Sequence, residues 1–403
     1  MTTTKNNEHK KLNFSSEREQ SQTCLNSAEH EKNQGRKVLN VPNLRFPEFV
    51  GEWEKCKLED VMNFSTTRVN SSELNEDNYV STENMLQDYQ GIVEAKSVPE
   101  DVNVISFSCG NILISNIRPY LKKVWKATFN GGCSSDVFVL KANDNIESDY
   151  LHYVIANDKF INFVMSGAKG VKMPRGDKKQ MKTYSLSLPQ IQEQHKIARL
   201  LSLLDERITT QNKIIDKLQS LIRGIRNDVF GKFRKSVGVN AMVGDVLSYE
   251  QPQPYIVEDT EYTAEGIPVL TANKAFVLGY TSETDGIYDK GDCIIFDDFT
   301  LDCKYVDFPF KVKSSAIKIL TVKDKELLRY TFEFMKYLDL STDEHKRHYI
   351  AETQNQELFL PTAQVVRTIA HAFSALSSRM KTVTKQRNMF ELQKQYLLRQ
   401  MFI

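Results

Sequence analysis

The sequence lacks the features of a membrane, secreted or zinc protein. No apolar run approaches the ~18 residues that a membrane span needs, and the first 30 residues lack the apolar segment of a secretory signal. The six cysteines among the 403 residues include no C-x-x-C pair, which excludes zinc-ribbon and thioredoxin-type motifs. We therefore expect a cytoplasmic protein with free thiols and no membrane partner.

Signatures of nucleotide and metal catalysis are also missing. There is no G-x-x-x-x-G-K-[ST] loop, no G-x-G-x-x-G after a strand and no H-E-x-x-H motif. Asp88 with Glu94 and Lys96 is the nearest approach to a nuclease metal site, but such triplets arise often in a charged chain. His345 and His348 lack a third ligand and are interpreted as exposed basic residues. The sequence thus predicts no catalytic residue, no metal site and no cofactor bound by this chain, with a stand-alone Mg²⁺ nuclease as an alternative.

Neither charge sign dominates. The chain has 53 Lys and Arg against 52 Asp and Glu, so a DNA contact must come from local basic patches. Hydrophobic residues make up 40% of the chain, which is ordinary for a globular protein, and the length suggests two or three domains. Residues 1–40 are polar and cannot offset their ordering entropy, so we expect a disordered tail there.

An internal repeat divides the rest of the chain. Leu188-Pro189 and Leu360-Pro361 open two long helical patterns, which start 172 residues apart (188 and 360) and end 172 residues apart (229 and 401). Upstream, Leu58-Glu59-Asp60-Val61 resembles Val243-Gly244-Asp245-Val246. This indicates a duplicated unit of one globular domain and one long helix. The expected segments are a domain at 41–187, a helix at 188–231, a domain at 232–359 and a helix at 360–403.

Both helical patterns carry heptads. One seam position recurs every seven residues, at Ile208, Ile215, Ile222 and Val229 in the first helix and at Leu376, Val383, Phe390 and Leu397 in the second. Such spacing predicts coiled-coil packing. The first helix carries the chain from one domain to the next, and the second should carry it back, so we expect the helices to be antiparallel. The predicted fold class is α+β, with two globular domains joined by two antiparallel coiled-coil helices in a pseudo-two-fold dumbbell.

The globular parts should mix strands and helices. Short β-type runs recur, for example at 103–107, 112–114 and 294–296, and Gly131-Gly132 is expected at a turn. Amphipathic helices are expected at 149–163 and 325–338.

Basic clusters are the candidate DNA-binding sites, because Lys and Arg neutralise phosphates and release counterions. The first cluster is expected at a strand end, the second in a glycine-containing loop and the third at the matching place of the second domain. Their residues are Arg118, Tyr120, Lys122 and Lys123; Lys169, Lys172, Arg175, Lys178 and Lys179; and Lys346, Arg347 and Tyr349. The alternative for each is a solvated loop.

Two small polar motifs occupy matching places in the repeat. Thr82 and Asn84 correspond to Thr271 and Asn273, the latter followed by Lys274. Their side chains could reach base edges, or they could form turns through side-chain-to-backbone hydrogen bonds. Both interpretations stay open.

Three segments resemble the specificity (S) subunits of type I restriction–modification systems. Residues 41–53 (VPNLRFPEFVGEW) resemble their opening, residues 110–121 a part of their target recognition domain, and residues 188–205 the start of their spacer helix. The resemblance implies a DNA-binding subunit without catalytic residues, in which each domain reads one half of a split, asymmetric double-stranded site.

The resemblance also implies partners. Two modification subunits, which bind S-adenosylmethionine, would dock on the chain, and restriction subunits, which use ATP and Mg²⁺, would join them. A purely structural coiled-coil scaffold without a DNA role is the remaining alternative.

Overall fold

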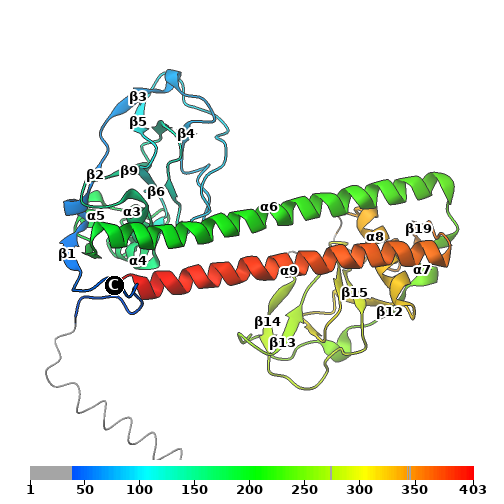
Figure 1. Cartoon of the computed structure of the whole chain (residues 1–403). Helices are drawn as coiled ribbons and strands as arrows, with labels where there is room; N and C mark the ends of the chain where they lie inside the picture. The colour runs from blue at the N-terminus through cyan, green and yellow to red at the C-terminus, as the bar shows by residue number, and fades with distance from the viewer. Residues whose placement is uncertain (1–38, 273–274, 343, 345) are drawn as a thin grey trace, which may run out of the picture. The chain divides into compact units, whose positions relative to one another are not determined.

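The computed structural model describes residues 39–403 except 273, 274, 343 and 345. The predicted tail at 1–40 thus falls almost wholly outside the described residues. The chain forms two compact units: unit 1 runs up to Leu203 and includes Gln393–Ile403, and unit 2 is Leu204–Leu392. Each unit contains one globular part, the start of one long helix and the end of the other (Figure 1). These helices are α6 (Ile191–Ser236) and α9 (Ala363–Met401).

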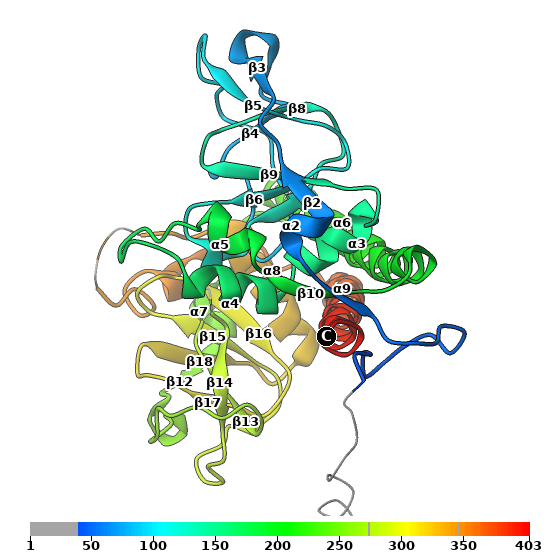
Figure 2. The same cartoon turned by 90° about the vertical axis from the view of Figure 1, so that its left-hand side faces the viewer.

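Unit 1 contains two four-stranded sheets and a strand pair. The first sheet has the antiparallel order β2 (Met62–Phe64), β9 (Val137–Ala142), β6 (Ile112–Ser115) and β7 (Val124–Lys126). The second has the order β3 (Arg68–Asn70), β5 (Asn103–Phe107), β8 (Gly131–Cys133) and β4 (Tyr79–Val80), and β1 (Glu54–Lys57) pairs with β10 (Ser185–Leu188). The helices α3 (Ser148–Ile155), α4 (Asp158–Ser166) and α5 (Lys178–Lys182) lie along one side of the first sheet (Figure 2).

Unit 2 repeats this plan. Its main sheet has the order β12 (Ser248–Glu250), β18 (Ile317–Thr321), β15 (Cys293–Asp297) and β16 (Cys303–Val306). A second sheet has the order β14 (Val277–Thr281), β13 (Ile267–Leu270) and β17 (Lys311–Val312), and β11 (Ala241–Met242) pairs with β19 (Glu357–Leu358). The helix α8 (Lys325–Leu338) has the bounds expected from its amphipathic pattern.

Short helices confirm the sequence repeat in structural detail. They are α2 (Leu58–Val61) and α7 (Val243–Val246). Asp60 accepts the main-chain N–H of Lys57 at 2.8 Å, and Asp245 accepts that of Met242 at 2.8 Å. A carboxylate in the first turn satisfies a free N–H at the helix start. The four-residue match in the sequence therefore marks one local structure used twice.

The long helices run in opposite directions within unit 2. The Arg207 guanidinium lies 5.6 Å from the centre of the Phe390 ring, while Phe230 at the other end of α6 shares a buried cluster with Val366. The seam residue Val383 is buried, as the heptad pattern predicts. Phe373 is also buried; it lies seven residues before Met380, on a second seven-residue series of α9 that the sequence analysis did not include.

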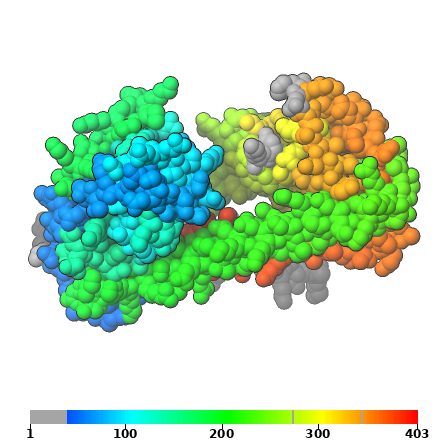
Figure 3. Space-filling model, turned by 90° about the horizontal axis from the view of Figure 1, so that it is seen from above, coloured from blue at the N-terminus to red at the C-terminus, as the bar shows by residue number. Residues whose placement is uncertain are grey.

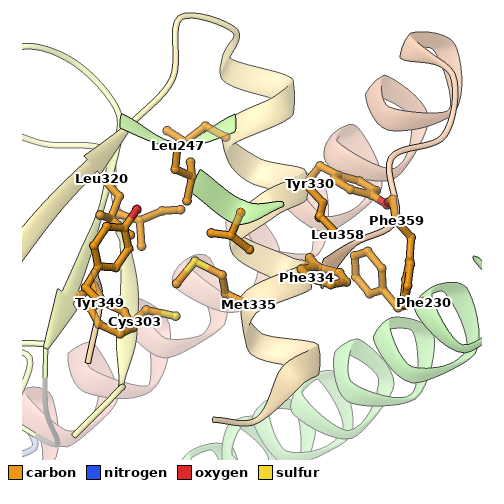
Figure 4. Close-up of a cluster of buried hydrophobic side chains, with 14 of the residues drawn as sticks. Phe230, Leu247, Cys303, Leu320, Tyr330, Phe334, Met335, Tyr349, Leu358 and Phe359 are labelled. Atoms are coloured by element: carbon orange, nitrogen blue, oxygen red, sulfur yellow. The ribbon is translucent and has the colours of Figure 1, made fainter. Parts of the chain in front are cut away.

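Aromatic residues join a helix end to the globular part in each unit. In unit 2 the ring of Phe230 lies 5.3 Å from that of Tyr330, inside a core that also contains Leu320 and Phe334 (Figure 4). In unit 1 Phe402 stacks on Tyr150 at 5.2 Å. Burial of such large rings is a main stabilising term for a domain. Each globular part is therefore fixed to the helix end that belongs to its unit.

Two local predictions were wrong. Gly131 and Gly132 lie in strand β8 rather than at a turn. Glycine is needed at position 131 because the chain passes close to Asn78: a Cβ on Gly131 would meet the Asn78 carbonyl oxygen at 2.0 Å. The expected helix at 149–163 is two helices, α3 and α4, because Asn157 caps a new helix by accepting the N–H of Lys159. The α+β class is confirmed, and the dumbbell arrangement stays a prediction.

Candidate nucleic-acid interface

Two loops of unit 1 meet beyond the end of strand β6. The strand-end loop (residues 116–123) follows β6, and the basic loop (residues 167–177) connects α4 to α5. The main-chain N–H of Arg118 donates to Pro174 at 2.8 Å, and that of Gly176 donates to Asn116 at 3.0 Å. The basic loop extends away from the helices in Figure 2 and stands out from the surface of unit 1 in Figure 3. The tertiary structure thus brings the first two basic clusters together.

Acidic residues of α3 and α4 pair with the first cluster. Lys122 binds Asp158 at 2.8 Å, and Lys126 binds Asp149. Lys123 donates to the Thr82 carbonyl oxygen at 2.5 Å, and burial lowers the pKa of its ammonium group. Lys122 and Lys123 are therefore engaged within the fold by groups that lie far from them in the sequence.

Tyr120 is the exposed side chain of the strand-end loop, whereas Arg118 is half-buried. Arg118 has a left-handed backbone conformation (φ +50°) and precedes the 3₁₀ turn Pro119–Leu121. Its Nε is buried without a hydrogen-bond partner among the described residues, and Tyr120 is exposed. A residue held in a strained conformation at a loop is more often functional than one in a relaxed loop.

The second cluster divides into free and engaged cations. Lys172 and Lys179 are exposed, and Lys169 has an 83% exposed side chain although it lies 3.5 Å from Asp177. Arg175 pairs with Asp136 at 3.3 Å. Backbone donation from Lys179 is the main cause that lowers the pKa of Asp177, so this carboxylate stays charged at the base of the loop. Lys169, Lys172 and Lys179 are the cations best placed for phosphates.

The extent of the second loop was predicted wrongly. Its last residues form helix α5, capped by Asp177, rather than a loop. Lys178 packs its ammonium group over the rings of Phe64 and Phe138, at 5.1 and 4.7 Å, and burial lowers its pKa. Lys178 thus covers the main sheet, and its contact with DNA stays a prediction.

The Thr82 and Asn84 motif forms a turn. Asn84 is only 5% exposed, and its amide group donates to the Tyr79 and Val93 carbonyl oxygens at 3.1 and 2.9 Å. Its Oδ1 accepts the Ser81 N–H at 2.7 Å. Both amide hydrogens and Oδ1 of Asn84 thus form hydrogen bonds within the turn, so Asn84 does not reach a base edge. The structural interpretation of the motif therefore holds in unit 1.

In unit 2 the matching motif is only partly described. Thr271 is buried, and its N–H donates to the Phe276 carbonyl oxygen at 3.0 Å, so it does not contact DNA through its side chain. Asn273 and Lys274 lie outside the described residues.

The third cluster lies where unit 2 repeats the paired loops. The His348 N–H donates to the Asp298 carbonyl oxygen at 3.1 Å, as Gly176 does to Asn116 in unit 1. Arg347 is exposed, and Lys346 is held by Glu344 and Glu352 at 2.5 and 3.0 Å, which raise its pKa. The correspondence of this stretch with the basic loop thus follows from backbone contacts.

Two residues of the third cluster are buried, contrary to prediction. Tyr349 is 1% exposed and belongs to the core drawn in Figure 4, where its ring lies 5.4 Å from that of Phe296. His348 is also 1% exposed, with Nδ1 2.9 Å from a Glu352 carboxylate oxygen. Neither side chain is an exposed basic or DNA-contacting group, and His345 lies outside the described residues.

Asp298 is a structural anchor that sequence reasoning missed. Its carboxylate accepts the N–H groups of His348 and Tyr349 at 3.1 and 2.8 Å, and it lies 3.8 Å from the ammonium group of the buried Lys318. The signal in the sequence was its position after strand β15, where the repeat places Asn116 in unit 1. Asp298 fixes the loop that carries Lys346 and Arg347.

Among the described residues, no three His, Cys, Asp or Glu side chains gather into a metal-binding group. Asp88, Glu94 and Lys96, the nuclease candidates, are all exposed. Among the described residues, no helix is both long and apolar enough to cross a membrane. The paired loops carry exposed cations, among them Lys172 in unit 1 and Arg347 in unit 2, on backbone held by hydrogen bonds.

Comparison with known proteins points to one class. Residues 51–220 match the family model of the type I restriction modification DNA specificity domain. The EcoR124I/EcoR124II specificity subunit of Escherichia coli is 39% identical over 172 residues, which cover 38% of this chain and 42% of that protein. The MjaVIII specificity subunit of Methanocaldococcus jannaschii is 34% identical over 103 residues, or 25% of this chain and 24% of that protein. The matched stretches therefore span less than half of these curated relatives.

A solved structure shares the fold of nearly the whole chain. The S subunit of a type I restriction–modification system from M. genitalium aligns with a TM-score of 0.63 and 15% identity, covering 90% of this chain and 99% of that one. The chain is thus similar to specificity subunits of type I restriction–modification systems over the matched stretches, and it shares the fold of one of them.

Proposed function

We propose that this chain is the sequence-specific DNA-binding subunit of a type I restriction–modification enzyme, acting in the cytoplasm. The observation that carries the proposal is the paired loop in each unit, which combines a strand-end loop with exposed cations on one backbone frame. Exposed Lys and Arg on such loops suit phosphate contacts, which fix the register of a protein on the duplex. The family of residues 51–220 agrees with this role.

Each unit would read one half of a split site. The loops share a frame but differ in side chains: Lys169 and Lys172 stand in unit 1, whereas Arg347 and the ion-paired Lys346 are exposed in the matching loop of unit 2. Different side chains at equivalent places select different base edges. The target should therefore be asymmetric, and α6 with α9 would set the gap between its halves.

The chain would position the chemistry that partner subunits perform. Two modification subunits would bind S-adenosylmethionine and methylate the site, and restriction subunits would use ATP and Mg²⁺. No cofactor would bind to this chain itself. A methyltransferase that flips its target base needs to be placed on that base, and specific binding supplies the placement.

A charge-reversal experiment tests the proposal. Lys169→Glu with Lys172→Glu should lower DNA affinity of the full chain, with its co-purifying subunits, by at least about tenfold, and reduce the slope of log affinity against log salt by about two. Lys141→Glu, an exposed strand residue of the same unit, is the matched control. Unchanged binding in the double variant would favour the scaffold alternative.

Sequencing for methylated adenines identifies the target. Host DNA with and without this gene should differ at one bipartite, asymmetric sequence. If the purified chain alone cuts DNA with Mg²⁺, and Asp88→Ala abolishes the cutting, the nuclease alternative replaces the proposal.

A further inference from the structure

The basic loop of unit 1 closes into a hairpin. The Lys169 N–H donates to the Arg175 carbonyl oxygen at 3.0 Å, and the Arg175 N–H donates back to Lys169 at 2.9 Å. Arg175 also forms a bridge with Ile117, and Pro174 is buried. The hairpin is therefore a narrow loop closed by one antiparallel residue pair on a fixed base. The major groove of B-DNA, about 12 Å wide, admits a two-stranded ribbon.

The tip of this hairpin is compact. Gly170 has a φ of +97°, and a Cβ added to it would lie 3.2 Å from the carbonyl oxygen of Met173. Only glycine tolerates both the left-handed backbone and this close approach. The tip is therefore a tight turn that needs glycine at position 170.

Apolar and basic side chains alternate at the tip. Val171 is fully exposed, at 103% of its reference area, and Met173 is 49% exposed. The neighbouring Lys169 and Lys172 are exposed as well. Apolar groups stabilise a fold only when they leave water, so Val171 contributes no packing to the described unit. The flanking cations favour a polyanion as the partner that would cover it.

We infer that Val171 and Met173 contact thymine C5-methyl groups in the major groove, while Lys169 and Lys172 bind the flanking phosphates. The methyl group of thymine is the apolar feature that the major groove offers to such side chains. The inference rests on the proposed function and adds two specificity-determining residues to it. Neither belongs to the basic clusters that sequence reasoning selected.

Deoxyuridine, which lacks the methyl group, provides the test. Once the target is known, each thymine in the half-site read by unit 1 is replaced singly, and affinity is measured with the full chain and its co-purifying subunits. Wild-type protein should lose about tenfold affinity at one or two positions. Val171→Ser with Met173→Ser should lose a similar factor on the thymine duplex and show no further loss with deoxyuridine. Lys172→Ala, the matched control, should weaken all duplexes alike and keep the sensitivity.

Several results would overturn the inference. One is that deoxyuridine lowers the DNA affinity of wild type and of the Val171→Ser, Met173→Ser variant by the same factor. Another is that the half-site read by unit 1 contains no A·T pairs. Release of a co-purifying subunit by the double variant, with DNA discrimination unchanged, would assign the tip to a protein partner instead. Val171→Thr, which keeps the branched shape, checks that any loss does not come from misfolding. Failure of wild-type protein to bind any duplex would refute the proposed function and not the inference alone.

Discussion

The main-chain N–H of His348 donates to the carbonyl oxygen of Asp298 at 3.1 Å, and this contact has a counterpart in the other unit between Gly176 and Asn116 at 3.0 Å. Gly176 and His348 are 172 residues apart (176 and 348), the same offset that separates the ends of the long helices. The duplication thus extends from the helices to the loops that carry the cations. One frame with different side chains suits a protein that reads two unlike half-sites.

Removal of Arg45 should destabilise unit 1. Its guanidinium binds both carboxylate oxygens of the buried Glu193, at 2.7 and 2.8 Å, and this bond raises the pKa of Arg45. Arg45→Ala leaves an unpaired buried carboxylate, so the free energy of unfolding should fall by about 3 kcal/mol. Urea unfolding followed by circular dichroism measures this. The double change Arg45→Met with Glu193→Met should recover most of the loss, and a single variant as stable as wild type would contradict the argument.

Asp298 should stabilise unit 2 through both its hydrogen bonds and its charge. Asp298→Ala removes the acceptor of two N–H groups and the carboxylate near Lys318, so we expect a loss of about 3 kcal/mol. Asp298→Asn keeps an oxygen acceptor and should lose less. Denaturant unfolding gives the free energy of unfolding of wild type, Asp298→Ala and Asp298→Asn. Equal losses of this free energy in both variants would show that the hydrogen bonds contribute little.

The loop around His348 should depend on pH. Donation to Glu352 is the main cause that raises the pKa of His348 from 6.5, and the same contact lowers the pKa of Glu352 from 4.5. A raised histidine pKa gives stability that is complete below pH 6.5 and is lost as pH rises through the folded value. The lowered glutamate pKa gives stability that is present above pH 4.5 and is lost as pH falls through the folded value.

Hydrogen exchange measures this dependence. Amides of residues 346–356 should exchange faster at pH 8 than at pH 6, after correction for intrinsic rates, and His348→Gln should remove the difference. The equivalent loop of unit 1, which has Gly176 at this place, is the internal control. A pH dependence of equal size in both loops would exclude His348 as its cause.

A heptad added to each long helix should lengthen the recognised gap. Seven residues inserted between Ile208 and Ile215, and seven between Val383 and Phe390, keep the seam pattern and add about 10 Å. At 3.4 Å per base pair, the gap between half-sites should grow by about three base pairs while the half-sites themselves stay the same. Methylation mapping in cells reports both. An unchanged gap would show that the helices do not set the spacing.

Much of the fold could be predicted because its signals are local. The heptads, the matched helix starts and runs such as 103–107 depend on periods of two to seven residues, and strand β5 has the bounds that its run predicts. Gly131 was wrongly assigned to a turn because glycine is required there by the close approach of the carbonyl oxygen of Asn78, a residue far away in the sequence. Phe373 was missed because later residues on its own seven-residue series, Arg387 and Lys394, are polar and interrupt the apolar repeat.

By itself the sequence determined the duplication, the helical seams, the secondary-structure class and the resemblance to specificity subunits, since each of these is written along the chain. Only the tertiary structure decided which cations are free. Lys122 and Arg175 meet carboxylates from distant elements, at Asp158 and Asp136, and Tyr349 leaves the surface for the core. Free charge depends on the partners that folding brings within a few ångströms, and no period in the sequence encodes that distance.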